Sequence, residues 1–203
     1  MLEAQKLTAR RGPARLFTDL AFRVGPGEAL VVTGENGAGK TTLLRMLAGL
    51  SVPTAGEIFW RGKQVAPFDR ALRDAVAYVG HLPAIKDELT AEENLASLVS
   101  IEGDAVRPGT IAKALDGVAL ERQRKLPARL LSQGQRRRIG LARLSLSVRP
   151  LWILDEPVTA LDAPGATLLA RILGGHLANG GVAVTATHAP LGLPEARLRQ
   201  LRL

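Results

Sequence analysis

Gly34-Glu35-Asn36-Gly37-Ala38-Gly39-Lys40-Thr41 is the stretch that decides the fold of this chain. It fits the phosphate-loop pattern G-x-x-x-x-G-K-[ST]. An apolar run at residues 29–32 precedes it, and a helix-like segment at residues 43–48 follows it. Because strand, glycine-rich loop and helix occur in the order that phosphate binding requires, the stretch predicts an α/β fold that holds a nucleoside triphosphate.

Each position of this loop has an expected task. Gly34, Gly37 and Gly39 supply tight turns, because glycine adopts left-handed backbone conformations without strain and lets the backbone approach a phosphate. Lys40 is expected to place its ammonium on the β- and γ-phosphates, and the Thr41 hydroxyl to ligate Mg²⁺. Backbone N–H groups of the loop and of the helix start complete the cradle; they belong to Glu35, Asn36, Ala38 and Thr42.

Length and composition limit the kind of protein. A chain of 203 residues suits one α/β domain with a small inserted subdomain. There is no cysteine, which excludes disulfides, thiolate metal sites and cysteine nucleophiles, and the 3 histidines are too scattered for a predictable metal site. No apolar stretch reaches the roughly 20 residues that a membrane-spanning helix needs.

The net charge favours acidic partners. It is +8, which suits a nucleotide, a nucleic acid or an anionic membrane surface. The aromatic residues are few, with 2 Trp, 1 Tyr and 4 Phe, and they are not interleaved with the arginines. A base-stacking surface is therefore not expected, and we predict no nucleic-acid partner.

Two kinds of sheet are expected. An antiparallel lobe is predicted by short strand-like segments near the start, which are residues 2–8 and 21–24. Residues 56–60, followed by Arg61-Gly62-Lys63, are expected to form a further strand and a turn. A parallel sheet is predicted by continuous apolar segments, because strands buried on both faces have that composition. These segments are residues 151–154 and 182–185, with a helix-like segment at residues 163–177 between them. Residues 75–79 are expected to form another short apolar strand.

Residues 82–130 differ from both sheets because they are polar and helix-like. Thr90-Ala91-Glu92-Glu93 matches a capping box, which opens a helix. We therefore expect residues 1–203 to form a single domain, in which residues 1–81 and 131–203 are the core with its β-lobe. Residues 82–130 are expected to be an inserted helical subdomain that continues into the helix after residue 131.

Two carboxylates follow one of the apolar runs. Leu151-Trp152-Ile153-Leu154 leads directly into Asp155 and Glu156, so both acids lie at the C-terminal end of a buried strand, where α/β sheets bind ligands. Asp155 is suited to holding Mg²⁺, and Glu156 to polarising the water that attacks a γ-phosphate. A solvated strand end is the alternative explanation of the pair.

A second motif lies between the loop and these carboxylates. Leu131-Ser132-Gln133-Gly134-Gln135 opens an amphipathic helix that runs to about Leu146. The segment resembles the signature motif of ATP-binding cassette (ABC) ATPases, usually Leu-Ser-Gly-Gly-Gln, with Gln133 in place of the first glycine. The resemblance covers nearly the whole chain. It implies a P-loop NTPase core of the ABC ATPase type with an antiparallel β-lobe and an inserted helical subdomain.

The resemblance also implies a composite site. The signature residues of one subunit, Ser132, Gln133, Gly134 and Gln135, would approach the γ-phosphate of an ATP held by Lys40 of a second copy. A head-to-tail dimer with two sandwiched ATP·Mg²⁺ follows from this arrangement. A serine at a helix N-terminus is a suitable anion site in physical terms as well, although an ordinary Ser-capped helix is the alternative.

Two short segments resemble further ABC motifs. Ala160-Leu161-Asp162 resembles the D-loop, which implies that Asp162 lies near nucleotide. Thr187-His188 resembles the switch-histidine loop, which implies that His188 bonds the γ-phosphate and orients the attacking water. Lys40, Glu156 and His188 are thus the expected catalytic residues.

Two positions depart from the family pattern. His81 stands where a Mg²⁺-ligating glutamine is usual. Since imidazole is a poorer ligand for Mg²⁺ than an amide oxygen, His81 acts through water or serves only coupling to a membrane partner. Arg11 stands near the place of an aromatic residue that stacks on adenine, and its guanidinium plane can also stack on a base.

Arg136-Arg137-Arg138 occupies one turn of the helix that follows the signature motif. Charge clusters of this kind usually form a solvated helix face, and we expect the same here. The alternative is a role near the nucleotide or at an interface.

One loop narrows the resemblance. Gly80-His81-Leu82-Pro83-Ala84-Ile85-Lys86, followed by Glu88-Leu89-Thr90-Ala91-Glu92-Glu93-Asn94-Leu95, is similar to the ATP-binding subunits of haem-exporter-type systems for bacterial cytochrome c maturation. This implies ATP hydrolysis that powers haem delivery or export, integral membrane partners, and a peripheral location on the cytoplasmic face of the inner membrane. No direct haem binding is expected, because no histidine lies in an apolar, aromatic-rich stretch.

Three other functions stay open at this point. The chain could be the ATPase of another small-substrate exporter, or a soluble ABC ATPase that acts on DNA or ribosomes. It could also be a module that binds nucleotide without turnover. Lys40, Asp155, Glu156 and His188 are all present, which argues against the last of these.

Overall fold

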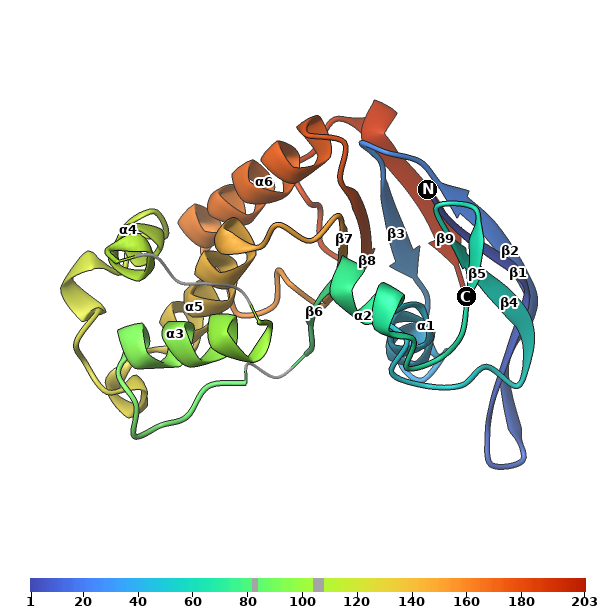
Figure 1. Cartoon of the computed structure of the whole chain (residues 1–203), viewed down its shortest axis with the longest axis horizontal. Helices are drawn as coiled ribbons and strands as arrows, with labels where there is room; N and C mark the ends of the chain where they lie inside the picture. The colour runs from blue at the N-terminus through green and yellow to red at the C-terminus, as the bar shows by residue number, and fades with distance from the viewer. Residues whose placement is uncertain (82–83, 104–107) are drawn as a thin grey trace. The chain divides into compact units, whose positions relative to one another are not determined.

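The computed structural model describes residues 1–81, 84–103 and 108–203 (Figure 1). These residues form two compact units. The sheet unit comprises Met1–Gly80, Arg149–Pro157 and Leu173–Leu203, and the helical unit comprises His81–Val148 and Val158–Ile172. Leu82 and Pro83, which belong to the loop that narrows the family resemblance, lie outside the described residues.

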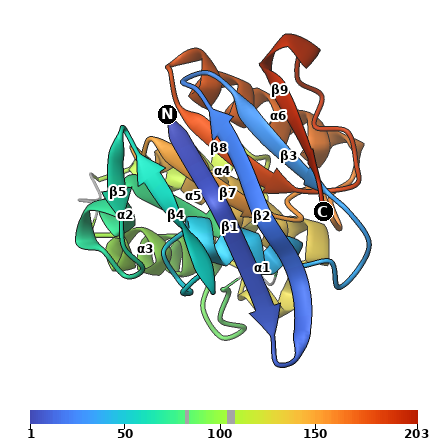
Figure 2. The same cartoon turned by 90° about the vertical axis from the view of Figure 1, so that its right-hand side faces the viewer.

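The antiparallel sheet of the sheet unit has the strand order β2-β1-β4-β5 (Figure 2). Its strands are β1 (Leu2–Arg11), β2 (Ala14–Val24), β4 (Ala55–Trp60) and β5 (Lys63–Val65). The first two strands are longer than the sequence predicts, because Arg10 pairs with Arg15 and Arg11 with Ala14. Only Gly12 and Pro13 therefore remain in the turn, where Gly12 has a φ of 60°.

The parallel sheet has the strand order β6-β7-β8-β3-β9. Its strands are β3 (Ala29–Thr33), β6 (Val76–Val79), β7 (Leu151–Asp155), β8 (Val182–Ala186) and β9 (Leu198–Arg202). Every residue of β7 and β8 is buried, as expected for strands covered on both faces. The α/β class and the two kinds of sheet predicted from the sequence are confirmed.

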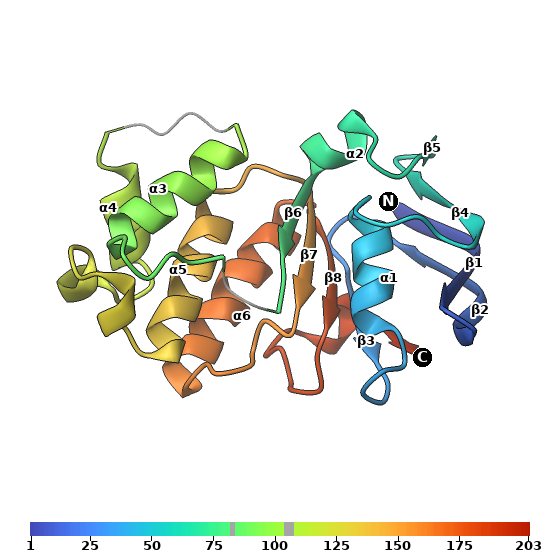
Figure 3. The same ribbon diagram turned by 90° about the horizontal axis from the view of Figure 1, so that it is seen from below.

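Helix α1 (Lys40–Leu47) joins the two sheets into one core (Figure 3). Leu43, Leu44 and Leu47 are fully buried on one side of this helix. They pack with residues of both sheets, among them Leu2 of β1 and Ile153 of β7. Full burial of a leucine side chain contributes about 1.5–3 kcal/mol, so the helix that begins at the phosphate loop is firmly anchored.

The helical unit contains three helices that contact one another, α3 (Ala91–Ile101), α4 (Thr110–Asp116) and α5 (Gln133–Leu146). The capping box predicted at Thr90 and Glu93 is present. Asn94, only 2% exposed, accepts from the Lys86 N–H and donates to the carbonyl oxygens of Lys86, Leu89 and Thr90. This one buried amide therefore holds the turn that leads into α3. Helix α6 (Ala163–Ala178) follows later in the chain.

Several short elements were not predicted from the sequence, among them the 3-10 helices at Glu121–Gln123, Ala128–Leu130 and Glu195–Arg197. Helix α2 (Arg70–Ala75), capped by the Asp69 carboxylate on the Ala71 N–H, replaces the start of the strand that was expected from residue 75. Strands β5 and β9 were not recognised either. None of the helices among the described residues is long and apolar enough to cross a membrane.

A half-buried histidine in the sheet unit makes the free energy of unfolding depend on pH. His176 stacks on Trp152 with ring centroids 3.8 Å apart, and its Nε2 donates to the Val182 carbonyl at 3.2 Å. Burial lowers the pKa of His176. The unfolded chain therefore binds more protons than the folded chain around this pKa, and stability falls as the pH drops below about 6.5.

We expect His176→Gln to flatten this acid side of the stability profile. The measurement is the urea midpoint followed by tryptophan fluorescence between about pH 7.5 and pH 5.5, a range that spans the ordinary histidine pKa. His81→Gln is the matched control, because His81 is exposed. A slope that is the same in wild type and in His176→Gln contradicts the assignment.

Candidate active site

The phosphate loop has the backbone conformation that its glycines allow. Gly34, Gly37 and Gly39 have φ values of 144°, 90° and 104°, in the region that favours glycine. A Cβ at Gly34 would lie 2.8 Å from the Leu203 carbonyl oxygen, and one at Gly39 would lie 3.1 Å from the Leu16 Cβ. Both glycines are therefore required by conformation and by space.

Lys40 closes back over this loop. Its ammonium donates to the carbonyl oxygens of Gly34, at 2.6 Å, and Glu35, at 3.1 Å, and the residue is only 9% exposed. Gly39, the N-cap of α1, has no side chain to accept from the first helical turn. The N–H groups of that turn, which includes Thr41 and Thr42, are consequently available to an anion.

Three strand ends meet at one edge of the parallel sheet. In the sheet register, Ala186 of β8 lies opposite both Asp155 of β7 and Val32 of β3. Neighbouring strands lie about 4.8 Å apart. The residues that follow this row are Glu156, His188 and Gly34. The structure therefore brings the phosphate loop, both carboxylates and the histidine to the same edge.

Asp155 is a buried carboxylate at this edge. It is 3% exposed, and no Lys, Arg or His of the described residues lies within ion-pair distance of it. Burial raises the pKa of Tyr78 on the neighbouring strand, and the negative charge of Asp155 raises it further. A buried anion of this kind calls for a cation, and oxygen ligands suit Mg²⁺.

Glu156 has an unusual backbone. Its φ is 51°, in the left-handed region, and its N–H donates to the Ala186 carbonyl at 2.9 Å. Such a conformation costs a non-glycine residue about 1–3 kcal/mol and is typical of functional sites. The side chain is half-buried. Glu156 is thus held in place by the neighbouring strand in spite of backbone strain.

His188 is exposed beside these residues. The preceding Thr187 is 1% exposed, and its hydroxyl accepts from the Ala189 N–H at 3.1 Å. This small turn holds the backbone on both sides of His188, while its imidazole faces solvent at the end of β8.

The signature segment is the N-terminus of α5 in the helical unit. The Ser132 hydroxyl accepts from the Gln135 N–H at 3.2 Å, and the Gln135 side chain accepts from the Ser132 N–H at 2.9 Å. A Cβ at Gly134 would lie 3.1 Å from the Ala160 carbonyl oxygen. The D-loop backbone therefore packs directly on the signature segment, and only a small residue fits between them.

The arginine run is not the solvated face that the sequence suggested. The Arg138 side chain is 12% exposed and binds both carboxylate oxygens of Asp162, at 2.8 and 2.9 Å. The Arg136 side chain is 19% exposed and pairs with Asp87 at 2.7 Å. That expectation was wrong for these two residues, because both acids come from segments distant in the sequence, which helix periodicity does not reveal.

Asp162 is fixed from two sides. Besides Arg138, it accepts from the Gly165 N–H at 3.0 Å, which caps the start of α6. The hydrogen bond from Arg138, and then that from Gly165, lower the pKa of Asp162. We call the bidentate pair of Arg138 and Asp162 the D-loop clamp.

The remaining expected residues are exposed. Arg11 lies beside the tip of the β1–β2 hairpin, and His81 lies at the start of the helical unit. Among the described residues there is no group of three or more His, Cys, Asp or Glu that could hold a metal by itself. Mg²⁺ is usually held by one or two carboxylates together with substrate phosphates, which fits Asp155 and Thr41.

Sequence reasoning missed a residue beside the phosphate loop. Leu16 of β2 is half-buried, and its Cβ would lie 3.1 Å from a Cβ at Gly39. The side chain of Phe17 is also close to that position. The local sequence does not predict the contact between Leu16 and Gly39, because this contact depends on how β2 packs against the phosphate loop.

Comparisons with known proteins agree with this geometry. The sequence model described as ABC transporter matches residues 17–159. The chain is 47% identical over 203 residues to the cytochrome c biogenesis ATP-binding export protein CcmA of Dechloromonas aromatica, covering 100% of both chains. It is 48% identical over 193 residues to the protein of the same name from Pseudomonas aeruginosa, covering 95% of each.

Solved structures show the same fold. An ATP-binding subunit of an ABC transporter is 26% identical and superposes with a TM-score of 0.83, covering 100% of this chain and 88% of that one. A dimeric ATP-binding cassette described as a post-hydrolysis state with bound ADP and Pi is 23% identical. Its TM-score is 0.80, and the match covers 93% of this chain and 88% of that one.

Proposed function

The chain belongs to the ABC transporter family and is an ATPase of that type, and from this premise we propose that the edge described above binds and hydrolyses ATP. The observation that supports the assignment is the shared row Asp155, Ala186 and Val32 at one edge of the parallel sheet, because Glu156, His188 and Gly34 follow these strand ends. A phosphate loop by itself, without carboxylates and a histidine at the same edge of the sheet, would support ATP binding but not ATP hydrolysis. With this row, a group that holds phosphate and a group that activates water share one edge.

We propose the following tasks for the nucleotide. The loop glycines and the N–H groups of Glu35, Asn36, Ala38 and Thr42 cradle the phosphates, and the Lys40 ammonium exchanges its carbonyl contacts for phosphate oxygens. Thr41 and Asp155 hold Mg²⁺, which supplies charge neutralisation on the phosphates. Leu16 offers an apolar surface beside the loop, and Arg11 a guanidinium for stacking on adenine.

Hydrolysis needs a water placed in line with the γ-phosphate. We propose that the Glu156 carboxylate accepts a proton from this water, and that His188 bonds the γ-phosphate and orients the water. The strained backbone of Glu156 suits this role, because it aims the carboxylate in a direction that an extended strand would not. His81 serves as a water-mediated ligand of Mg²⁺ or in coupling.

The signature segment completes the site from a second copy of the chain. We propose a head-to-tail dimer in which Ser132 and Gly134 of one subunit contact the γ-phosphate bound by the other, with Gln133 and Gln135 beside them. The positive dipole end of α5 supports this, because it favours an anion, although the capping box already uses the Ser132 hydroxyl and the N–H groups of Ser132 and Gln135. One solved ATP-binding cassette of the same fold is itself described as dimeric, which supports the proposed pairing.

For the cellular role, we propose that the chain powers haem delivery or export for cytochrome c maturation, together with integral membrane subunits at the cytoplasmic face of the inner membrane. The full-length identity to proteins named for cytochrome c biogenesis supports this. Identity of 47% over the whole chain favours this role over a different exporter or a soluble ABC ATPase.

Co-purification from native membranes tests this role. We expect the tagged chain to recover integral membrane proteins together with ATPase activity in the membrane fraction. Recovery of ribosomes or DNA without any integral membrane protein would favour the soluble alternative. Absence of ATPase activity even with the recovered partners present would contradict the enzymatic function itself.

The D-loop clamp yields a further expected result. Arg138→Ala and Asp162→Asn each remove the ion pair, and asparagine still caps α6. If the clamp positions the signature segment, each variant lowers kcat about tenfold, as misplaced catalytic groups do, while ATP affinity of the monomer is unchanged. The double variant should be no worse than either single one, because both lose the same interaction.

The measurement is steady-state ATPase activity with nucleotide affinity measured separately. Arg122→Ala is the matched control, because Arg122 is an exposed arginine of the same unit. A loss of kcat that is additive in the double variant, or equal in the control, means that the pair has no shared positioning role.

A further inference from the structure

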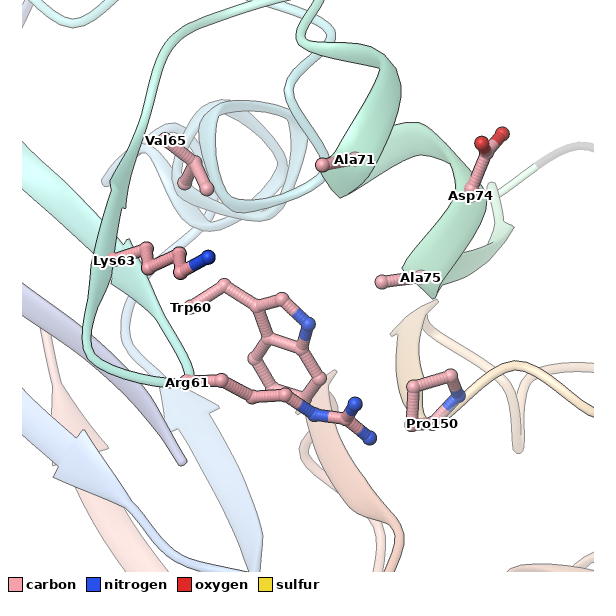
Figure 4. A pocket seen from close by; sticks show the side chains of 8 residues that line it. All are labelled: Trp60, Arg61, Lys63, Val65, Ala71, Asp74, Ala75 and Pro150. Atoms are coloured by element: carbon pink, nitrogen blue, oxygen red, sulfur yellow. The ribbon is translucent and has the colours of Figure 1, made fainter.

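A pocket of about 450 Å³ opens in the sheet unit between the β4–β5 hairpin and α2 (Figure 4). Its volume is in the range typical of small-molecule sites. Pro150, which lines the pocket, directly precedes β7, whereas Asp155 is the last residue of that strand. A strand of 5 residues spans roughly 17 Å. The pocket is therefore distinct from the nucleotide edge.

The hairpin presents two cations on a rigid frame. Arg61 and Gly62 form its turn, with φ values of 52° and 80°, as in the tight turn that matches strand twist. Trp60 and Lys63 are cross-strand partners, so their side chains share one face. The Arg61 guanidinium carbon lies 5.5 Å from the centroid of the Trp60 ring.

Apart from Asp74, the side chains that line the pocket are apolar or are hydrogen-bond donors. Its walls are the Trp60 indole and the side chains of Val65, Ala71, Ala75 and Pro150. Figure 4 shows the Arg61 side chain passing along one side of the indole toward Pro150, and the Lys63 ammonium ending near the start of the Trp60 side chain on its other side. Asp74 also lines the pocket, but its carboxylate points away and pairs with Arg70 at 3.5 Å.

The two cations have no acidic partner of their own. No Asp or Glu in the described part of the chain lies within ion-pair distance of Arg61 or Lys63. An ionised carboxylate only accepts hydrogen bonds, whereas the groups that face this space only donate them. The pocket therefore complements an anion with a compact apolar body.

We propose that this pocket is a binding site for a small amphiphilic carboxylate, either aryl or alkyl. Its apolar body lies on the Trp60 indole against Ala71 and Ala75, and its carboxylate accepts from Lys63 and Arg61. The small alanines leave the room that the apolar body fills. This site does not depend on the nucleotide function, since none of its residues belongs to the phosphate loop.

Fluorine NMR of the protein labelled with 5-fluorotryptophan tests the proposal. The chain has 2 tryptophans, so two resonances report Trp60, which is 8% exposed at the pocket, and Trp152, which is 3% exposed, and Trp152→Phe assigns them. The probe is 4-tert-butylbenzoate, with 4-tert-butylbenzamide as its neutral counterpart. We expect the acid to shift the Trp60 resonance with a Kd of about 1 mM or below, as its size allows, and to leave Trp152 unmoved.

The amide should bind about tenfold more weakly or worse, and Lys63→Gln and Arg61→Gln should each weaken the acid to a similar extent. Ala71→Leu should weaken both probes, because it fills the space. Arg15→Gln, which changes an exposed arginine elsewhere in the same unit, should change nothing.

Three results would overturn the proposal. The first is no shift of the Trp60 resonance at about 10 mM acid, roughly ten times the expected Kd. The second is equal binding of acid and amide that Lys63→Gln leaves unchanged. The third is loss of binding in Lys40→Ala, because the carboxylate would then occupy the phosphate loop instead.

Discussion

Replacing Glu156 by Gln is expected to lower kcat for ATP hydrolysis by about 10²–10⁴-fold while ATP still binds. The amide has nearly the same shape as the carboxylate but cannot accept the proton of the attacking water. The groups that hold phosphate, among them the Lys40 ammonium, are left unchanged. Because hydrolysis is blocked after closure, we also expect the variant to accumulate as an ATP-bound dimer.

Two measurements check this expectation. Steady-state phosphate release at saturating ATP gives kcat, and size-exclusion chromatography with and without ATP·Mg²⁺ gives the oligomeric state. Glu121→Gln is the control, because Glu121 is an exposed glutamate of the helical unit. Near-normal turnover in Glu156→Gln would remove this residue from the mechanism. A variant that stays monomeric with ATP would argue against the sandwich dimer.

Lys40→Ala is expected to weaken ATP binding and turnover together, by about 10²–10³-fold in kcat/KM, as the loss of one preorganised charge at a reacting phosphate does. The ammonium lies at the loop before any ligand is bound, fixed on the Gly34 and Glu35 carbonyls. The position of the ammonium is therefore fixed before ATP binds, and residues 34–41 contain no other Lys or Arg that could replace it.

Binding of a fluorescent ATP analogue and ATPase activity are measured side by side, with the melting temperature as a check on folding. Lys113→Ala, a change at an exposed lysine of α4, is the control. If Lys40→Ala melts like wild type and still binds the analogue normally, the role proposed for the ammonium is wrong. If the melting temperature of Lys40→Ala is much lower than that of the wild type, the binding assay is repeated with Lys40→Arg, which keeps the positive charge.

Much of the fold could be predicted because its signals are local. The phosphate loop, its preceding strand and its following helix are contiguous, so their order alone indicates the arrangement. The buried strands β7 and β8 consist of continuous apolar residues. Asp155 is the last residue of β7, Glu156 follows it directly, and His188 lies two residues after the end of β8. The parallel register then brings them to one edge, as strand order predicts.

The features that were missed depend on contacts between distant segments. From the local sequence, Arg138 is predicted to be one of three exposed charges. Its partner Asp162 lies 24 residues later, so the ion pair is evident only in the structure. Leu16 lies against Gly39 only because β2 folds back beside the loop. Helix α2 is 6 residues long, which is too short for a helical period to show.

Strand β3 leads into the phosphate loop, and the two strands that pair with it are synthesised last. The strands that flank it are β8 and β9, which are Val182–Ala186 and Leu198–Arg202, whereas β3 is Ala29–Thr33. Pairing across such separations raises contact order and slows folding. A nascent chain that has emerged only as far as the helical unit therefore holds the complete loop sequence without the sheet that shapes it. Chaperones would meet an exposed apolar strand at that stage, and nucleotide could bind only once the final strands are in place.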